Sequence, residues 1–125
     1  MKSEFHDQPR VFEVGLKHKI KMLDCGQLQL ASDEQITFIT EGGSEYDVAR
    51  KSWGFYATPS LNNRLPKYGF RPVLVKSPQA SFFIFLVEKN KEADFEIYLK
   101  SENHQIICWL DSDENLKILV ETFCE

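Results

Sequence analysis

The chain has 125 residues, a length that suits one domain and allows a hydrophobic core without disulfides or metal. Hydrophobic residues make up 42% of it and ten residues are Phe, a composition that excludes an intrinsically disordered chain. The net charge of −4 provides no broad positive field, so we expect no nucleic-acid partner.

Cysteine usage and the N-terminal segment indicate the compartment. Cys25, Cys108 and Cys124 form no C-x-x-C pair and cannot all pair with one another, which favours a reducing compartment. No stretch approaches the roughly 18 apolar residues of a membrane span, and the N-terminus has no apolar signal segment. We expect a cytoplasmic protein with no membrane association, with a flexible lead over residues 1–9 and a single domain over residues 10–125.

The first periodic segment predicts a β-hairpin. Residues 16–22 alternate between lysines and largely apolar side chains, and residues 27–30 repeat the alternation. The tripeptide Asp24-Cys25-Gly26 between them predicts the turn. His18 falls on the apolar face of the first strand, where a histidine with one hydrogen-bond partner is a commoner finding than a metal ligand.

Alternating or continuous apolar runs predict six further strands. Gly42-Gly43 predicts a hairpin turn between the first two of them. Pro72 lacks a backbone N–H, so we expect its strand to lie at a sheet edge or to start at the proline. Residues 82–87 are apolar at every position, which predicts the most buried strand. These expected strands cover residues 35–40, 45–49, 53–58, 70–75, 82–87 and 105–110.

The period changes after Asn90, which can cap a helix. Phe95, Tyr98 and Leu99 have helical spacing, but Phe95, Ile97 and Leu99 also alternate, so a strand stays open as the alternative to the favoured helix.

A last helix is predicted after the capping pair Asp111-Ser112. Its apolar stripe comprises Leu116, Leu119, Val120 and Phe123. The expected fold is a single α+β domain, an antiparallel meander of seven or eight strands with two late helices packed on the sheet. Ile97 and Ile118 lie off the stripes of the two helices, which suggests a second contact surface and a homodimer.

No catalytic or cofactor motif occurs. The chain has neither G-x-G-x-x-G nor G-x-x-x-x-G-K-[ST], and no G-x-S-x-G elbow surrounds a serine. His6, His18 and His104 lack the spacing of metal ligands. We therefore expect no cofactor, no metal and no catalytic residue, and we favour a protein that is not an enzyme.

The segment from residue 53 to residue 71 is the candidate binding site. An aromatic ring beside an amide and a guanidinium can hold a sugar or a planar ring, and two arginines suit an anionic group. The candidate ligand-binding residues are Trp53, Tyr56, Asn62, Arg64 and Arg71. The alternative is that the aromatics belong to the core and that Asn62 only shapes a turn.

This candidate site and several segments around it resemble a known group of proteins. The resemblance rests on the residues of seven short segments and on their order in the chain: 45–48, 50–51, 53–62, 64–65, 69–71, 87–89 and 108–110. In these the chain, over about residues 24 to 120, resembles a family of small uncharacterised bacterial proteins encoded among cell-surface polysaccharide and acidic-sugar biosynthesis genes. The resemblance implies a role in that pathway and carries over no activity or catalytic residue.

Three functions follow as hypotheses. The first is a small non-catalytic binding or accessory protein, in bacterial surface-polysaccharide biosynthesis, that recognises an anionic sugar, a nucleotide-sugar or a partner enzyme. The first alternative is a protein-interaction or assembly module with no small ligand. The second alternative is a small sugar-modifying enzyme. The direction in which the aromatics point separates the three. An open concave patch favours a ligand, a flat apolar patch favours a protein partner, and a cleft in which Glu or Asp faces His favours an enzyme.

Overall fold

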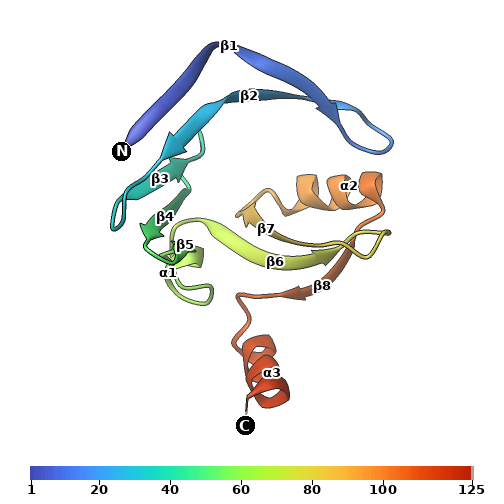
Figure 1. Cartoon of the computed structure of the whole chain (residues 1–125). Coiled ribbons are helices and arrows are strands. Elements are labelled where there is room, and N and C mark those ends of the chain that lie inside the picture. Colours follow the sequence, from blue (N-terminus) through green and yellow to red (C-terminus); the bar gives the residue numbers. More distant parts are fainter. Residues whose placement is uncertain (125) are drawn as a thin grey trace.

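The computed structural model describes residues 1–124, and within them it has eight strands and three helices (Figure 1). In chain order the elements are β1 (Lys2–Val14), β2 (Ile20–Gln29), β3 (Gln35–Ile39), β4 (Glu45–Lys51), β5 (Gly54–Ala57), α1 (Arg64–Lys67), β6 (Phe70–Lys76), β7 (Phe82–Glu88), α2 (Glu92–Glu102), β8 (Gln105–Trp109) and α3 (Asp113–Phe123).

The α+β class is confirmed, but the expected single meander is wrong. The strands form three small antiparallel sheets with the orders β1-β2, β3-β4-β5 and β7-β6-β8, and there is a third, one-turn helix, α1. The three sheets are separated by stretches of the chain that belong to no strand. The longest such stretch holds Pro59, Pro66 and α1 between β5 and β6, and a proline cannot donate to a ladder.

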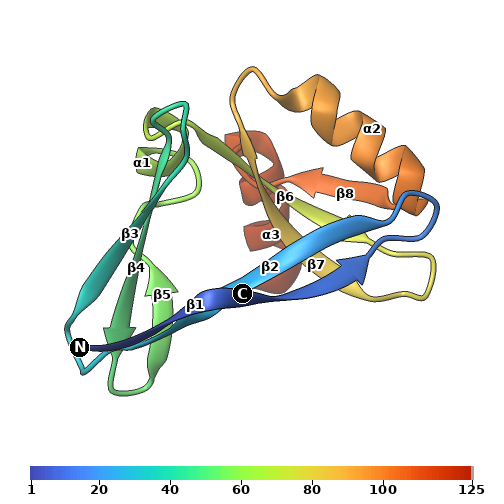
Figure 2. The same cartoon turned by 90° about the horizontal axis from the view of Figure 1, so that it is seen from above.

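Strands β1 and β2 form a long two-stranded arm, residues 2–29, that crosses over the rest of the molecule (Figures 1 and 2). Most of the expected flexible lead, residues 1–9, therefore lies in β1. The turn predicted at residues 24–26 is wrong, because Gly26 lies within β2 opposite Phe5, next to a register shift. Gly26 has φ of +140°, and a Cβ there would run into the Glu4 carbonyl oxygen, so the glycine permits a bulge rather than a turn.

The core lies on one face of the β7-β6-β8 sheet. Val73 and Val75 of the central strand β6 are fully buried and pack with Val87 and with Leu99 of α2. Helix α2 covers this face, and α3 lies on the opposite side of the sheet (Figures 1 and 2). The favoured helix after Asn90 is thus confirmed as α2.

Strand β7 is not the most buried strand, contrary to the sequence-based prediction. It lies at the edge of its sheet and pairs only with β6. Phe82, Phe83 and Ile84 are exposed, and only Val87 is buried. An apolar run alone cannot tell an edge strand from a central one, because strand order depends on pairing with distant segments.

Strand β6 is central although it contains Pro72, so the predicted edge position is also wrong. The Pro72 carbonyl accepts a hydrogen bond from the backbone N–H of Leu110 at 2.9 Å. In an antiparallel ladder the N–H and C=O of one residue point to the same side. An N–H at Pro72 would therefore point toward Leu110, one residue past the end of β8, where the ladder has ended and no donor is needed.

The predicted last helix is confirmed as α3. Ser112 caps it, and its side chain accepts a hydrogen bond from the N–H of Asn115 at 3.2 Å. No residue of α3 is buried. One of the two late helices is thus packed into the core, and the other keeps much of its apolar surface exposed.

Hydrogen bonds join the β3-β4-β5 sheet to the β7-β6-β8 sheet. One Glu88 oxygen accepts from the Thr40 hydroxyl at 2.6 Å and from the Ser44 hydroxyl at 2.9 Å. These bonds lower the pKa of the Glu88 carboxyl below its ordinary value. The Glu45 N–H donates to the Tyr68 carbonyl nearby. This junction fixes the β3-β4-β5 sheet relative to the β7-β6-β8 sheet.

Candidate functional site

Trp53 and Tyr56 form an exposed aromatic pair beside β5. Their ring centroids lie 6.0 Å apart at an interplanar angle of 29°. Trp53 is 70% exposed and Tyr56 is 46% exposed. The two rings are therefore surface groups and not core residues, as a stacking platform for a planar ligand requires.

Arg64 at the start of α1 faces Asp47 of β4, the strand that pairs with β5. Its guanidinium donates to the Tyr68 hydroxyl at 3.0 Å and lies 3.9 Å from the carboxylate of Asp47. The hydrogen bond to Tyr68 is the main cause that raises the pKa of Arg64, and Asp47 and Tyr56 add smaller contributions. Arg64 thus sits within the electrostatic reach of Tyr56 and keeps about half of its side chain exposed.

The other two predicted site residues are bound within the chain. The Arg71 guanidinium lies 4.0 Å from the ring centroid of Trp109, and its Nε donates to Asp111 at 2.8 Å. The Asn62 amide donates to Asp113 at 2.9 Å. Both interactions hold the segment that leads into α3. The structure therefore places Trp53 and Tyr56 side by side and sets Arg64 against Tyr68 and Asp47. It places Asn62 and Arg71 at a separate structural contact.

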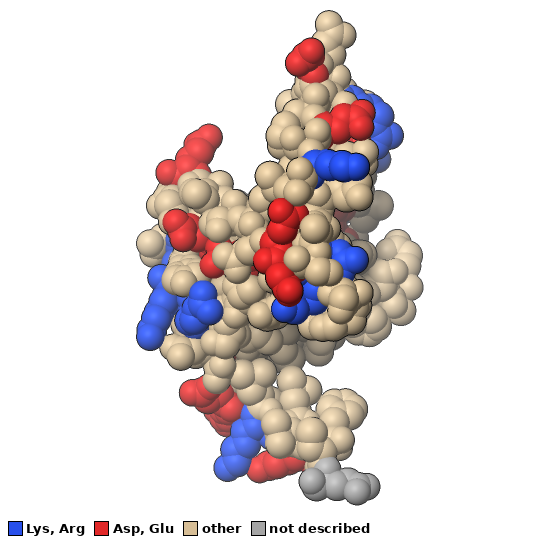
Figure 3. All heavy atoms as spheres, turned by 60° about the vertical axis from the view of Figure 1, so that its left-hand side comes forward, with Lys and Arg blue, Asp and Glu red and all other residues tan. Residues whose placement is uncertain are grey.

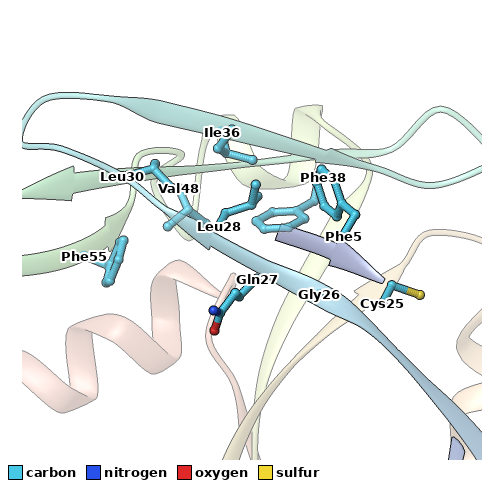
Figure 4. Close-up of a pocket in the computed structure, with 10 residues that line it drawn as sticks. All are labelled: Phe5, Cys25, Gly26, Gln27, Leu28, Leu30, Ile36, Phe38, Val48 and Phe55. Carbon is cyan, nitrogen blue, oxygen red and sulfur yellow. The ribbon is translucent and has the colours of Figure 1, made fainter. Parts of the chain in front are cut away.

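An apolar pocket of about 410 Å³ lies between the arm and the β3-β4-β5 sheet (Figure 4). Its wall combines side chains of β2 with side chains of β3 and β4, which point toward one another, and adds aromatic rings from β1 and β5. The lining residues are Phe5, Cys25, Gly26, Gln27, Leu28, Leu30, Ile36, Phe38, Val48 and Phe55. None of them is charged, so the pocket suits an apolar group.

The arm beyond this pocket is apolar on much of its surface. Phe12 pairs with Met22 and Val14 pairs with Ile20, so these four side chains share one face. Eight large apolar side chains of the arm are exposed: Phe5, Val11, Phe12, Val14, Leu16, Ile20, Met22 and Leu23. A two-stranded ribbon has no interior of its own, and isolated ribbons are at best marginally stable in water.

The total surface is larger than the mass of the chain requires. The accessible area is 9179 Å², whereas a compact monomer of 14.6 kDa exposes about 6,900 Å². The excess is about 2,300 Å², a third of the expected area. Charged side chains of both signs are interspersed among the other residues in Figure 3. The exposed apolar side chains of the arm contribute to this surface.

The described residues 1–124 contain no group of three or more His, Cys, Asp or Glu side chains that could share a metal ion. His18 lies in the exposed turn of the arm and not on a strand face, which corrects the expectation for it. His104 instead stacks on Phe83, with ring centroids 6.1 Å apart. No helix in this part of the chain has the length and apolarity that crossing a membrane requires.

The sequence-based reasoning missed the arm and its pocket. The signal was present, because Phe12 and Val14 alternate with Glu13 and Gly15 directly upstream of the first predicted strand. Comparison of the chain with protein-family models, with curated proteins and with solved structures found no match.

Proposed function

We propose that this protein is a non-catalytic assembly or accessory protein, and that its arm and the apolar pocket at the base of the arm bind a partner protein. The observation that supports this most is the accessible area, about 2,300 Å² above that of a compact monomer, together with the apolar side chains of the arm. Large exposed apolar surfaces mark interaction sites.

The energetics favour an interface larger than the arm alone. Burying the exposed half of each large apolar side chain contributes about 1 kcal/mol, so the eight arm residues contribute about 8 kcal/mol. Association costs about 4 to 15 kcal/mol in lost freedom of motion. A stable complex therefore needs the arm together with the pocket or another apolar surface.

The length of the arm favours a protein over a small ligand. The 13 residues of β1 span about 40 Å when extended. The pocket of about 410 Å³ is within the size range of small-ligand pockets, so it is the length of the apolar surface beyond the pocket that favours a protein. The apolar surface continues from the pocket along the arm. It therefore fits a polypeptide segment that lies along the arm and places one side chain in the pocket. The resemblance noted above makes an enzyme of surface-polysaccharide assembly the first class of partner to examine.

The test compares three versions of the full chain, each recovered under mild conditions from the cells in which it functions. The arm variant is Phe12→Ser combined with Met22→Ser. The matched control, Glu13→Ser with Lys21→Ser, changes a cross-strand pair of the same two strands on the opposite face. We expect the wild type and the control to co-purify with a partner in stoichiometric amounts and the arm variant to lose it. An arm variant that keeps every partner of the wild type would contradict the proposal.

A second candidate function is recognition of an anionic sugar or nucleotide-sugar by Trp53, Tyr56 and Arg64. The exposed, stacked pair of rings favours it, and the half-exposed guanidinium of Arg64 beside Asp47 supplies a cation for the anionic group. Titration with nucleotide-sugars should then quench tryptophan fluorescence in the wild type and not in Trp53→Phe, with Trp109 present in both. Equal responses of the two proteins would remove this candidate.

A further inference from the structure

Arg50 of β4 is the arginine that the described residues 1–124 leave without a carboxylate. Arg10, Arg64 and Arg71 each pair with an aspartate, at 2.8 to 3.9 Å. The Arg50 guanidinium has no such partner there, and it donates one hydrogen bond, to the Gly54 carbonyl at 3.3 Å. Arg50 is also half-buried. A guanidinium that has lost part of its water and has no counter-charge favours an anion from outside the chain.

Arg50 shares a sheet face with the apolar pocket at the base of the arm. Val48 and Arg50 are two residues apart on β4, so their side chains lie on one face. Val48 pairs with Ile36 and Arg50 pairs with Phe55, and Val48, Ile36 and Phe55 all line the pocket. The guanidinium lies 5.6 Å from the centroid of the Phe55 ring, which stands at one end of the pocket (Figure 4). The cation is therefore at the rim of the pocket.

A second, more polar cavity adjoins the pocket at this rim. It has a volume of about 620 Å³ and is lined by Arg50. The two cavities share four lining residues, Gln27, Leu28, Leu30 and Phe55. They therefore form one continuous site with an apolar end and a polar end.

The polar end carries more positive than negative charge. Lys2 and Arg50 line it, and Glu4 is the one carboxylate among its lining residues. The Gln27 amide donates to this carboxylate at 3.4 Å. The lining thus has a surplus positive charge beside a pocket without any charged residue. An amphipathic anion complements this arrangement.

We infer that the two cavities bind a small amphipathic anion of the fatty-acid type, with its hydrocarbon chain in the apolar pocket and its carboxylate on the guanidinium of Arg50. The planar guanidinium can donate to both oxygens of a carboxylate. The volume of the apolar pocket lies in the range of small-ligand sites. This inference goes beyond the proposed function and shares its pocket. A bound chain would occupy the space of the partner's side chain, so the two should compete.

The test measures the binding of decanoate to the isolated full chain by isothermal titration calorimetry. Arg50→Met removes the charge, and Phe38→Ser removes an exposed apolar side chain from the pocket wall. Arg10→Met is the matched control, because Arg10 has a 71% exposed side chain and lines neither cavity. Decyltrimethylammonium is the control ligand, with a similar chain and the opposite charge. Circular dichroism and thermal melting establish that each variant folds.

We expect Arg50→Met to bind decanoate about 10- to 100-fold more weakly than the wild type, the effect of a charged hydrogen bond. Phe38→Ser should also bind it more weakly, and Arg10→Met should match the wild type. Decyltrimethylammonium should bind the wild type more weakly than decanoate does. Equal decanoate affinities of Arg50→Met and the wild type, equal or tighter binding of the cationic ligand, or no binding at millimolar decanoate would overturn the inference.

The results also separate this inference from the proposed function. A chain that keeps a partner through its arm but binds no decanoate contradicts this inference only. If Arg50→Met in addition loses that partner, the carboxylate belongs to the partner and the small-molecule site is likewise refuted. Decanoate binding that depends on Arg50, together with an arm variant that keeps every partner, contradicts the proposed function only.

Discussion

Arg71 provides the most informative stability measurement, because its contacts make it a structural residue. Replacing it with Met removes a charged hydrogen bond to Asp111, worth about 1.5 to 3 kcal/mol, and leaves that carboxylate, which is 14% exposed, without a partner. The guanidinium 4.0 Å from the Trp109 ring adds about 0.5 to 1 kcal/mol. We therefore expect a loss of about 2 to 4 kcal/mol in the free energy of unfolding of Arg71→Met.

The assay is urea unfolding followed by tryptophan fluorescence, with thermal melting as the second readout. For a chain of this size the loss corresponds to a melting temperature lower by about 8 to 15 °C. Arg64→Met is the matched control, and we expect a change within about 0.5 kcal/mol, because its side chain is about half exposed and Asp47, 3.9 Å away, keeps its hydrogen bond from the Thr37 hydroxyl. Asp111→Asn added to Arg71→Met should recover part of the loss. Equal stabilities of the two arginine variants would refute the structural role of Arg71.

Three further predictions concern the core and the junction between the sheets. The hydrogen bonds from Thr40 and Ser44 lower the folded-state pKa of Glu88, so its contribution to stability is complete above the ordinary pKa of 4.5 and is lost as the pH falls through the folded-state pKa. Urea unfolding from pH 6 to pH 3 measures this loss, and Glu88→Gln should flatten this part of the curve of stability against pH. Gly69→Ala should cost about 2 kcal/mol or more in chemical denaturation, because φ is +102° and a Cβ would run into the Ser44 hydroxyl. Leu65→Ala should cost about 2 to 5 kcal/mol in the same assay, since Leu65 is fully buried.

Elements with local signals could be predicted from the sequence. The hairpin of β3 and β4 follows from β-branched residues around Gly42-Gly43, and both late helices follow from apolar spacing. The cap of α3 by Ser112 is likewise a local signal. These features depend on residues within one turn or one hairpin, so no long-range information is needed.

Sheet order and the division into three sheets could not be predicted. The apolar run of β7 and the proline of β6 both suggested positions opposite to those they occupy. Those positions depend on β8, which follows β7 and α2 in the chain and pairs with β6. The arm was missed for a related reason. A strand exposed on both faces has no buried partner in its own chain, and so the polar residues of 1–9 suggested a lead without structure.

The candidate site shows the same limit. The contact between Trp53 and Tyr56 is local, because the two residues are close in the chain. The partners of Arg71 and Asn62 lie 40 and 51 residues further along the chain. No spacing rule connects such residues, and only the fold shows that these two side chains already have partners.

The central claim, that the arm is covered by another protein, is tested most directly by hydrogen exchange. The measurement follows the backbone amides of residues 10–23 by mass spectrometry, in the complex recovered from cells and in the same protein after dilution to the separated chain. We predict slow exchange in the complex, comparable to that of β6, and fast exchange in the separated chain, because a two-stranded ribbon alone is only marginally stable. Fast exchange of these amides in an intact complex would contradict the claim.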